Sequence, residues 1–229
     1  MDGGAAMLTK PAFRKVDWLA RDIAVERRDD GTVVLKSRIP LQAYETHIPA
    51  YLAKWAAQAP ERIWLAQRGG PDRQWRKVSY GEAKRTVDAL TQSLLNLGVG
   101  EGRPVAILSG NSIEHALMTQ AAMQARLPAA PVSPAYSLMS RDFDKLRSMI
   151  ALLEPGAIYV SARGPFAAAL AAIAPLHEGS IISGNPDDAG TLAFAAIAGT
   201  PVTPDVDEAF ARVTPDTIAK FLFTSGSTG

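Results

Sequence analysis

The sequence predicts an α/β fold, in which a mostly parallel β-sheet is flanked by helices on both faces. Three observations lead to this prediction. Short apolar segments that suit buried strands alternate with longer segments of helical periodicity. The connections between them are short and contain the Gly, Pro, Ser and Asn residues typical of turns. The 229 residues are 47% apolar, which is enough to bury a substantial core.

The first 45 residues precede this alternation. They carry mixed charges, and Asp30-Gly31 is flanked by alternating residues that suit two short strands joined by a tight turn. We therefore expect an N-terminal extension with a hairpin over residues 1–45, followed by a single domain over residues 46–229.

Two helices are expected next. Apolar residues recur at helical spacing from Thr46 to Gln58, and Pro60 stops the run. Further on, Ser79 followed by Glu82 makes a capping box, and Gly98 takes the position that a helix C-cap prefers. The apolar stripe between these caps consists of Ala83, Val87, Leu90, Leu94 and Leu97.

Strands and helices then alternate. Pro104 to Leu108 suits a buried strand, and residues 109–112 supply a turn and an N-cap for a buried helix that reaches about Ala125. Later strands are expected at Ala130–Val132, Ala157–Val160 and Ser180–Ser183, and later helices at Ser140–Leu153 and Pro165–Ala174. Short connections between strand and helix favour parallel strands covered on both faces.

The last part of the chain changes character. Residues 203–216 are rich in Pro and acidic residues, which suits an exposed linker. Lys220 to Phe223 is expected to form a short apolar strand. Directly after it come six residues drawn only from Gly, Ser and Thr, namely Thr224, Ser225, Gly226, Ser227, Thr228 and Gly229.

Such a loop suits a polyphosphate. Its glycines allow backbone amides to face one point without obstruction, and its hydroxyls can donate to phosphate oxygens. It lacks the Gly-Lys-Ser/Thr ending of a Walker loop. The alternative is a flexible Gly/Ser linker, but a linker follows a domain edge, whereas Phe221 to Phe223 lead into this loop without a break.

Composition excludes several classes of function. With 24 Lys and Arg against 23 Asp and Glu, no excess charge favours nucleic acid as a partner. There is no Cys, and three scattered His do not make an ordinary metal site, so no metal ligand and no catalytic residue is assigned. No segment has the ~20 apolar residues of a membrane span, and no apolar signal segment is present, so we expect a cytoplasmic protein.

The remaining polar and aromatic motifs fit structural roles better than chemical ones. Asn111 and Ser112 suit a helix cap, and Pro134 and Tyr136 suit a turn with its anchoring aromatic residue. His115 is expected to be packed or exposed, because no carboxylate is placed on its helix face to orient it.

The loop also carries a family resemblance. Phe223 to Gly229 resembles the phosphate-binding signature of the adenylate-forming (AMP-binding) acyl-CoA synthetase superfamily. Further motifs follow in the order and spacing of that family, at Val78–Glu82, Leu97–Gly100, Pro104–Ile107, Asn111-Ser112 and Pro131–Ser137. The last of these is most similar to feruloyl-CoA synthases.

The resemblance implies the first part of the large N-terminal domain of an adenylate-forming ligase. It implies an acid–CoA ligase that uses ATP, Mg²⁺ and coenzyme A, with a small-molecule carboxylic acid such as ferulate as substrate. Thr224 to Gly229 would bind the ATP phosphates. Because the family's signature continues with Pro and Lys, and its other catalytic groups lie further on, we expect residues 46–229 to be a partial domain that is inactive alone.

Two alternatives stay open. The chain could come from another adenylate-forming enzyme, such as a fatty acyl-CoA ligase or a carrier-protein-loading adenylation domain. It could also be a non-catalytic nucleotide-binding α/β module whose loop is rich in Ser and Gly. The sequence does not indicate an oligomeric state.

Overall fold

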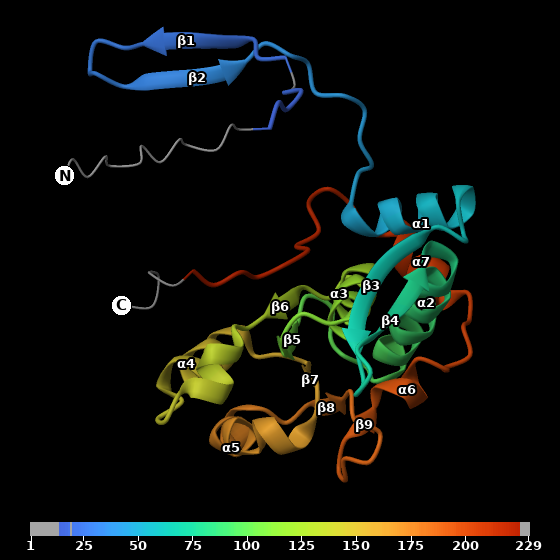
Figure 1. The fold of residues 1–229 in the computed structure, drawn as a ribbon. Helices are drawn as coiled ribbons and strands as arrows, with labels where there is room; N and C mark the ends of the chain where they lie inside the picture. Colours follow the sequence, from blue (N-terminus) through green and yellow to red (C-terminus); the bar gives the residue numbers. More distant parts are fainter. Residues whose placement is uncertain (1–13, 19, 225–229) are drawn as a thin grey trace, which may run out of the picture. The chain divides into compact units, whose positions relative to one another are not determined.

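The computed structural model describes residues 14–18 and 20–224, and it contains two compact units, Met1–Tyr44 and Glu45–Gly229 (Figure 1). In the first unit, β1 (Ile23–Arg27) and β2 (Val33–Ser37) pair antiparallel. Gly31 turns the chain at φ +86°, and the amide of Thr32 donates to the Asp30 side chain at 2.9 Å. The hairpin predicted at Asp30-Gly31 is therefore confirmed.

A five-stranded parallel sheet forms the centre of the second unit, in the order β6-β5-β7-β8-β9. Its strands are β5 (Val105–Leu108), β6 (Ala129–Pro131), β7 (Ala157–Val160), β8 (Ser180–Ser183) and β9 (Leu192–Ala193). Each pairing is parallel, and the strands at the centre of the sheet are buried on both faces. The α/β class with a parallel sheet flanked by helices is thus confirmed.

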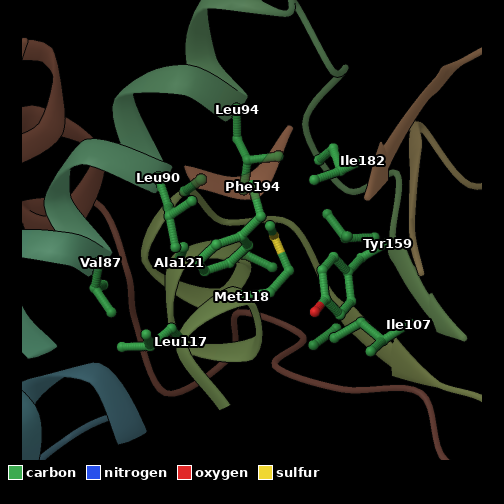
Figure 2. Packing of buried hydrophobic residues seen from close by; sticks show 14 of the residues in the cluster. Val87, Leu90, Leu94, Ile107, Leu117, Met118, Ala121, Tyr159, Ile182 and Phe194 are labelled. Carbon is green, nitrogen blue, oxygen red and sulfur yellow. The ribbon is translucent and has the colours of Figure 1, made fainter. Parts of the chain in front are cut away.

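Helices cover both faces of this sheet. Two of them, α2 (Tyr80–Asn96) and α3 (Ile113–Gln124), pack on one face, and α4 (Asp144–Leu153) and α5 (Arg163–Ile173) pack on the other. Figure 2 shows the first face, where Leu90 and Met118 of the helices meet Ile107 and Tyr159 of the strands. The predicted capping box at Ser79 is present, and Gly98 lies at φ +63° as a C-cap requires.

Other elements surround this core. Helix α1 (Ile48–Gln58) begins two residues after the predicted start. The sequence pattern did not predict the antiparallel hairpin of β3 (Ile63–Gly69) and β4 (Gln74–Ser79), the π-helical turn η1 (Ala135–Met139), the 3-10 turn η2 (Ala174–Leu176) or the short helix α6 (Phe194–Ile197). No helix in the described part of the chain is long and apolar enough to cross a membrane.

The predicted linker at residues 203–216 is wrong over its centre. Helix α7 (Asp205–Ala211) lies there, and it buries Val206 and Ala209. Three acidic residues occupy its first turn, where they stabilise the helix dipole. The helix is too short to show a periodic apolar stripe, so its composition resembled that of a linker.

The predicted strand from Lys220 to Phe223 is also wrong. Lys220 forms a single parallel bridge to Ala129, in which the Ala129 amide donates to Ala219 at 2.9 Å and the Phe221 amide donates to Ala129 at 3.0 Å. The next rung of a parallel ladder would need an N–H from Pro131, which has none. Residues 221–224 do not form a strand.

The helix predicted from Ser140 begins later, at Asp144. Phe143 has a left-handed backbone at φ 57°, and its amide donates to the Ser140 side chain at 3.1 Å. The backbone therefore cannot be helical through this turn, although Leu146, Ile150 and Leu153 are buried on one side as predicted.

Candidate functional site

The carboxyl ends of all five strands lie at one edge of the sheet, because every strand pair is parallel. In open α/β sheets, ligands bind outside this edge. The residues that leave β5, β6, β7 and β8 here include Ser109, Ser133, Ser161 and Gly184. Small and hydroxyl-bearing residues thus gather where a ligand is expected.

Ser109 and His115 form a close pair at the end of β5. The Ser109 hydroxyl lies 2.9 Å from Nδ1 of His115, and only 3% of the Ser109 surface is exposed. The amide of His115 donates to the Ser112 hydroxyl at 3.0 Å, so Ser112 is the predicted N-cap of α3. Burial lowers the pKa of His115, and the charge of Lys220 adds to this shift, while hydrogen bonds with the backbone of Gly110 and Ser109 oppose it.

Tyr159 of β7 interacts with Ser112, the cap of α3. Its ring is buried between the strands and α3, with the hydroxyl at the end of the strand (Figure 2). Burial raises the pKa of the Tyr159 phenol well above its ordinary value, while a hydrogen bond with Ser112 opposes the shift. Tyr159 therefore stays protonated and acts as a neutral hydrogen-bonding group.

Asp188 organises the loop after β8. The Ser183 hydroxyl donates to this carboxylate at 2.5 Å, the Asn185 side-chain amide donates at 2.9 Å, and the Arg163 backbone amide also donates to it. These hydrogen bonds hold the pKa of Asp188 below its ordinary range. Because the acceptors of Asp188 are used within the protein, its role is to fix the loop against the first turn of α5.

The predicted phosphate-binding residues follow the segment that is hydrogen-bonded to β6. This segment forms one parallel bridge to β6, at Ala129, the first residue of that strand. Thr224 is exposed, whereas Ser225, Gly226, Ser227, Thr228 and Gly229 lie outside the described residues. Phe221, Leu222 and Phe223 line a cavity of about 490 Å³. Its other lining residues are 102–104, which precede β5, and 152–154, which precede β7, so this cavity lies at the amino edge of the sheet.

The other sequence candidates have structural surroundings. Asn111 lines a cavity of about 200 Å³ with Gln67, and Tyr136 packs against the apolar cluster under α4 and α5. His47 packs edge-on against Phe210 at 5.1 Å between ring centroids. Among the described residues, no three His, Cys, Asp or Glu side chains are grouped as metal ligands.

Sequence reasoning did not find the pair of Ser109 and His115. Ser109 and His115 are six residues apart, and the turn between β5 and α3 brings them together. The sequence predicted that turn, and the turn was the available indication that the two side chains lie close together.

Comparison with solved structures shows the fold. Acetoacetyl-CoA synthetase from Streptomyces lividans has a TM-score of 0.64 and 20% identity, over 79% of this chain and 28% of that chain. The fatty acyl-adenylate ligase from L. pneumophila has a TM-score of 0.57 and 15% identity, over 79% of this chain and 28% of that chain. At these identities the likeness extends to the fold alone.

Comparison of sequences shows the family. The chain is 28% identical over 155 residues to a Humulus lupulus protein named "Probable CoA ligase CCL9", which covers 66% of this chain and 27% of that protein. The chain thus spans about a quarter of the length of this relative. Residues 52–229 match the family described as AMP-binding enzyme. With most of its length inside this match, the chain belongs to the AMP-binding enzyme family.

Proposed function

We propose that this chain is part of an ATP-dependent acid–CoA ligase. The ligase first joins a carboxylic acid to AMP and then transfers the acyl group to the thiol of coenzyme A. Membership of the AMP-binding enzyme family and the likeness to a protein named as a CoA ligase support this function.

The single observation that carries the proposal is the Gly/Ser/Thr loop that directly follows residues 219–223. Two hydrogen bonds to Ala129 hold the start of this segment beside β6, and the segment leads into the Gly/Ser/Thr loop. A loop of Gly, Ser and Thr supplies backbone amides and hydroxyls that suit a polyphosphate. Thr224, Ser225, Gly226, Ser227, Thr228 and Gly229 are the proposed phosphate-binding residues.

The proposed loop contributes positioning and electrostatic stabilisation. A carboxylate oxygen of the acid bonds to the α-phosphorus of ATP, and the bond to pyrophosphate breaks. The loop amides and hydroxyls hold the departing β- and γ-phosphates. Mg²⁺, when bound, offsets phosphate charge. Among the described residues, no three His, Cys, Asp or Glu side chains are grouped as ligands for the ion.

An aromatic acid such as ferulate is the proposed substrate. The support is the run Pro131 to Ser137, which resembles feruloyl-CoA synthases. In the structure, this run leaves β6 and enters the π-helical turn η1, where Ser137 is 4% exposed and its hydroxyl has no hydrogen-bond partner within the described residues. Such π-helical turns are frequent at functional sites.

The test uses the protein expressed from its complete reading frame. We expect acid-dependent exchange between ATP and pyrophosphate, followed by thioester formation when coenzyme A is added, with ferulate, coumarate and benzoates preferred over fatty acids. The Ser227→Ala variant should lower kcat/KM by about 10-fold or more if its hydroxyl binds phosphate. Ser148→Ala on the exposed side of α4 is the matched control and should leave activity unchanged.

Other outcomes identify the alternatives. A preference for long-chain acids would indicate a fatty acyl-CoA ligase. Exchange without a CoA thioester would indicate an adenylation domain that loads a carrier protein. ATP binding without exchange for any acid would indicate a non-catalytic nucleotide-binding module and would overturn the ligase proposal.

A further inference from the structure

The hairpin of the N-terminal unit has one open apolar face. Val25 of β1 lies opposite Leu35 of β2 in the cross-strand register. Because successive side chains alternate between the two faces of a strand, Ile23 and Val33 lie on the same face as this pair. These four side chains are each between 46% and 66% exposed. A two-stranded hairpin is marginally stable in water, whereas a larger sheet with an apolar face is stable, so the hairpin gains from further strands.

The outer edge of β1 can accept such a strand. Within the described residues, β1 pairs with β2 alone. The Arg28 amide donates to the Thr32 carbonyl at 2.9 Å. At the other end of the hairpin, the Arg38 amide donates to the Asp22 carbonyl at 2.8 Å. Since hydrogen bonding alternates along an antiparallel pair, the even-numbered residues of β1 bond to β2, and the odd-numbered ones point their backbone groups to the outer edge.

A second copy of β1 fits this edge in an antiparallel, two-fold arrangement. Outward-pointing backbone groups meet each other only where an odd-numbered residue faces an odd-numbered one, which requires a two-fold axis that passes through a residue. An axis at Ala24 places Asp22 opposite Glu26 of the other copy, and an axis at Glu26 places Asp22 opposite Asp30. Like charges directly opposite each other destabilise a sheet, so these two registers are disfavoured.

The register with its axis at Val25 brings opposite charges together. Asp22 of each copy faces Arg28 of the other, and all five residues of β1 are paired. Within the hairpin, Asp22 pairs with Arg38, and Arg28 pairs with Glu26, but all four side chains of these ion pairs are more than half exposed. Exposed ion pairs contribute little to stability, so Asp22 and Arg28 can take partners from a second copy.

We propose that the outer edge of β1 is an interface between two copies of this chain, in which β1 pairs antiparallel with its copy about Val25. The two hairpins then form one four-stranded sheet in the order β2-β1-β1-β2, with the apolar residues of both on one face. Backbone hydrogen bonds join the copies, and the charges of Asp22 and Arg28 select the register. This interface does not depend on the proposed ligase function.

Cysteine cross-linking tests the register in the protein expressed from its complete reading frame. The 229 residues contain no Cys. In Val25→Cys, the two introduced thiols lie on hydrogen-bonded partners with Cα atoms about 5.5 Å apart, which suits a disulfide. Under a mild oxidant we expect a covalent dimer, and peptide mapping should show the link between the two copies of position 25.

Leu35→Cys is the matched control for cross-linking. Leu35 is exposed on the same face as Val25, but it lies on β2. In the proposed sheet, three strand spacings, or about 14 Å, separate it from its copy, which is too far for a disulfide. We therefore expect about tenfold less cross-linking for Leu35→Cys than for Val25→Cys.

Charge exchange tests the same register without a covalent bond. Asp22→Arg and Arg28→Asp each place like charges opposite one another, and each should weaken self-association by about tenfold, because two attractive pairs become repulsive. An equimolar mixture of the two variants restores opposite charges and should associate as tightly as the parent protein. Sedimentation equilibrium measures these affinities. Asp72→Arg, in the exposed turn between β3 and β4, is the matched control and should associate normally.

The mixture separates an effect between copies from an effect inside one hairpin. Mixing cannot repair the ion pairs with Arg38 or Glu26, because these lie within each chain. Recovery in the mixture, together with selective cross-linking of Val25→Cys, would support the interface. A protein that sediments as a monomer at every concentration would overturn the interface. Equal cross-linking of Val25→Cys and Leu35→Cys, or a dimer that neither charge change weakens, would also overturn it. Weakened single variants without recovery in the mixture would show that the register is wrong.

Discussion

The two edges of the parallel sheet are built differently. At the amino edge, backbone meets backbone: a Cβ added to Gly179 would lie 2.3 Å from the carbonyl oxygen of Gly156. Arg103 closes the same edge by donating to the carbonyls of Glu154 and Pro155, both at 3.1 Å. At the carboxyl edge, hydroxyl, imidazole and carboxylate side chains make the connections.

The difference shows how one sheet combines stability with binding. Close backbone packing is present at both edges, since a Cβ on Gly184 would lie 2.6 Å from the carbonyl oxygen of Ser161. What distinguishes the carboxyl edge is its set of polar side chains, such as Ser109 and His115. These groups can exchange an internal partner for a ligand, whereas a backbone contact cannot.

The largest expected effect is at the amino edge. Gly179→Ala should lower the free energy of unfolding by about 3 kcal/mol, because the added methyl group meets backbone that cannot move without separating β7 from β8. Urea unfolding followed by circular dichroism measures this change.

Gly164→Ala is the matched control. Gly164 lies in α5, and a Cβ there meets nothing within 4 Å. This variant should raise the free energy of unfolding by about 0.5–1 kcal/mol, because Ala has less freedom than Gly in the unfolded chain. Equal effects of the two variants would show that the amino edge is not closely packed.

Some elements of the fold could be predicted from the sequence, and others could not. The buried strands and the capped helices were predictable because local signals such as Ser79, Gly98 and Ser112 agree with the tertiary structure. The hairpin of β3 and β4 was missed because its residues are mostly polar and exposed. Helix α7 was missed because its burial depends on α2 and α3, which lie far away in the sequence.

The candidate site was predictable only in part. The Gly/Ser/Thr loop is a local pattern, so the sequence indicated it directly, and its phosphate-binding role stays a prediction. The position of Lys220 depends on a parallel bridge to Ala129. A contact of that kind joins segments with no shared periodicity, so no local pattern could predict it.

A smaller effect is expected at the carboxyl edge. Ser112→Ala removes the hydroxyl that accepts from the His115 amide at 3.0 Å and should lower the free energy of unfolding by about 1 kcal/mol. The same variant should alter the NMR signal of the His115 ring, because the first turn of α3 loses its cap. Ser148→Ala, within α4, should change neither quantity, and an unchanged stability of Ser112→Ala would argue against the cap.

The smallest effect depends on pH and concerns His177 at the amino edge. Burial lowers the pKa of His177, although backbone groups of Ser180 and Pro155 oppose the shift, and neither ring nitrogen makes a hydrogen bond of normal geometry. Since the unfolded state then binds the proton more readily, the stability due to neutral His177 is complete above the ordinary His pKa of about 6.5 and is lost as the pH falls below it.

His177→Phe keeps the ring and removes its titration. The free energy of unfolding of this variant should therefore fall less between pH 7.5 and 5.5 than that of the parent chain, by less than the limit of about 1.4 kcal/mol per pH unit for one proton. Urea unfolding of both proteins at the two pH values measures the difference. Parallel pH profiles would show that His177 titrates normally, and the amino edge would then be open to water rather than sealed.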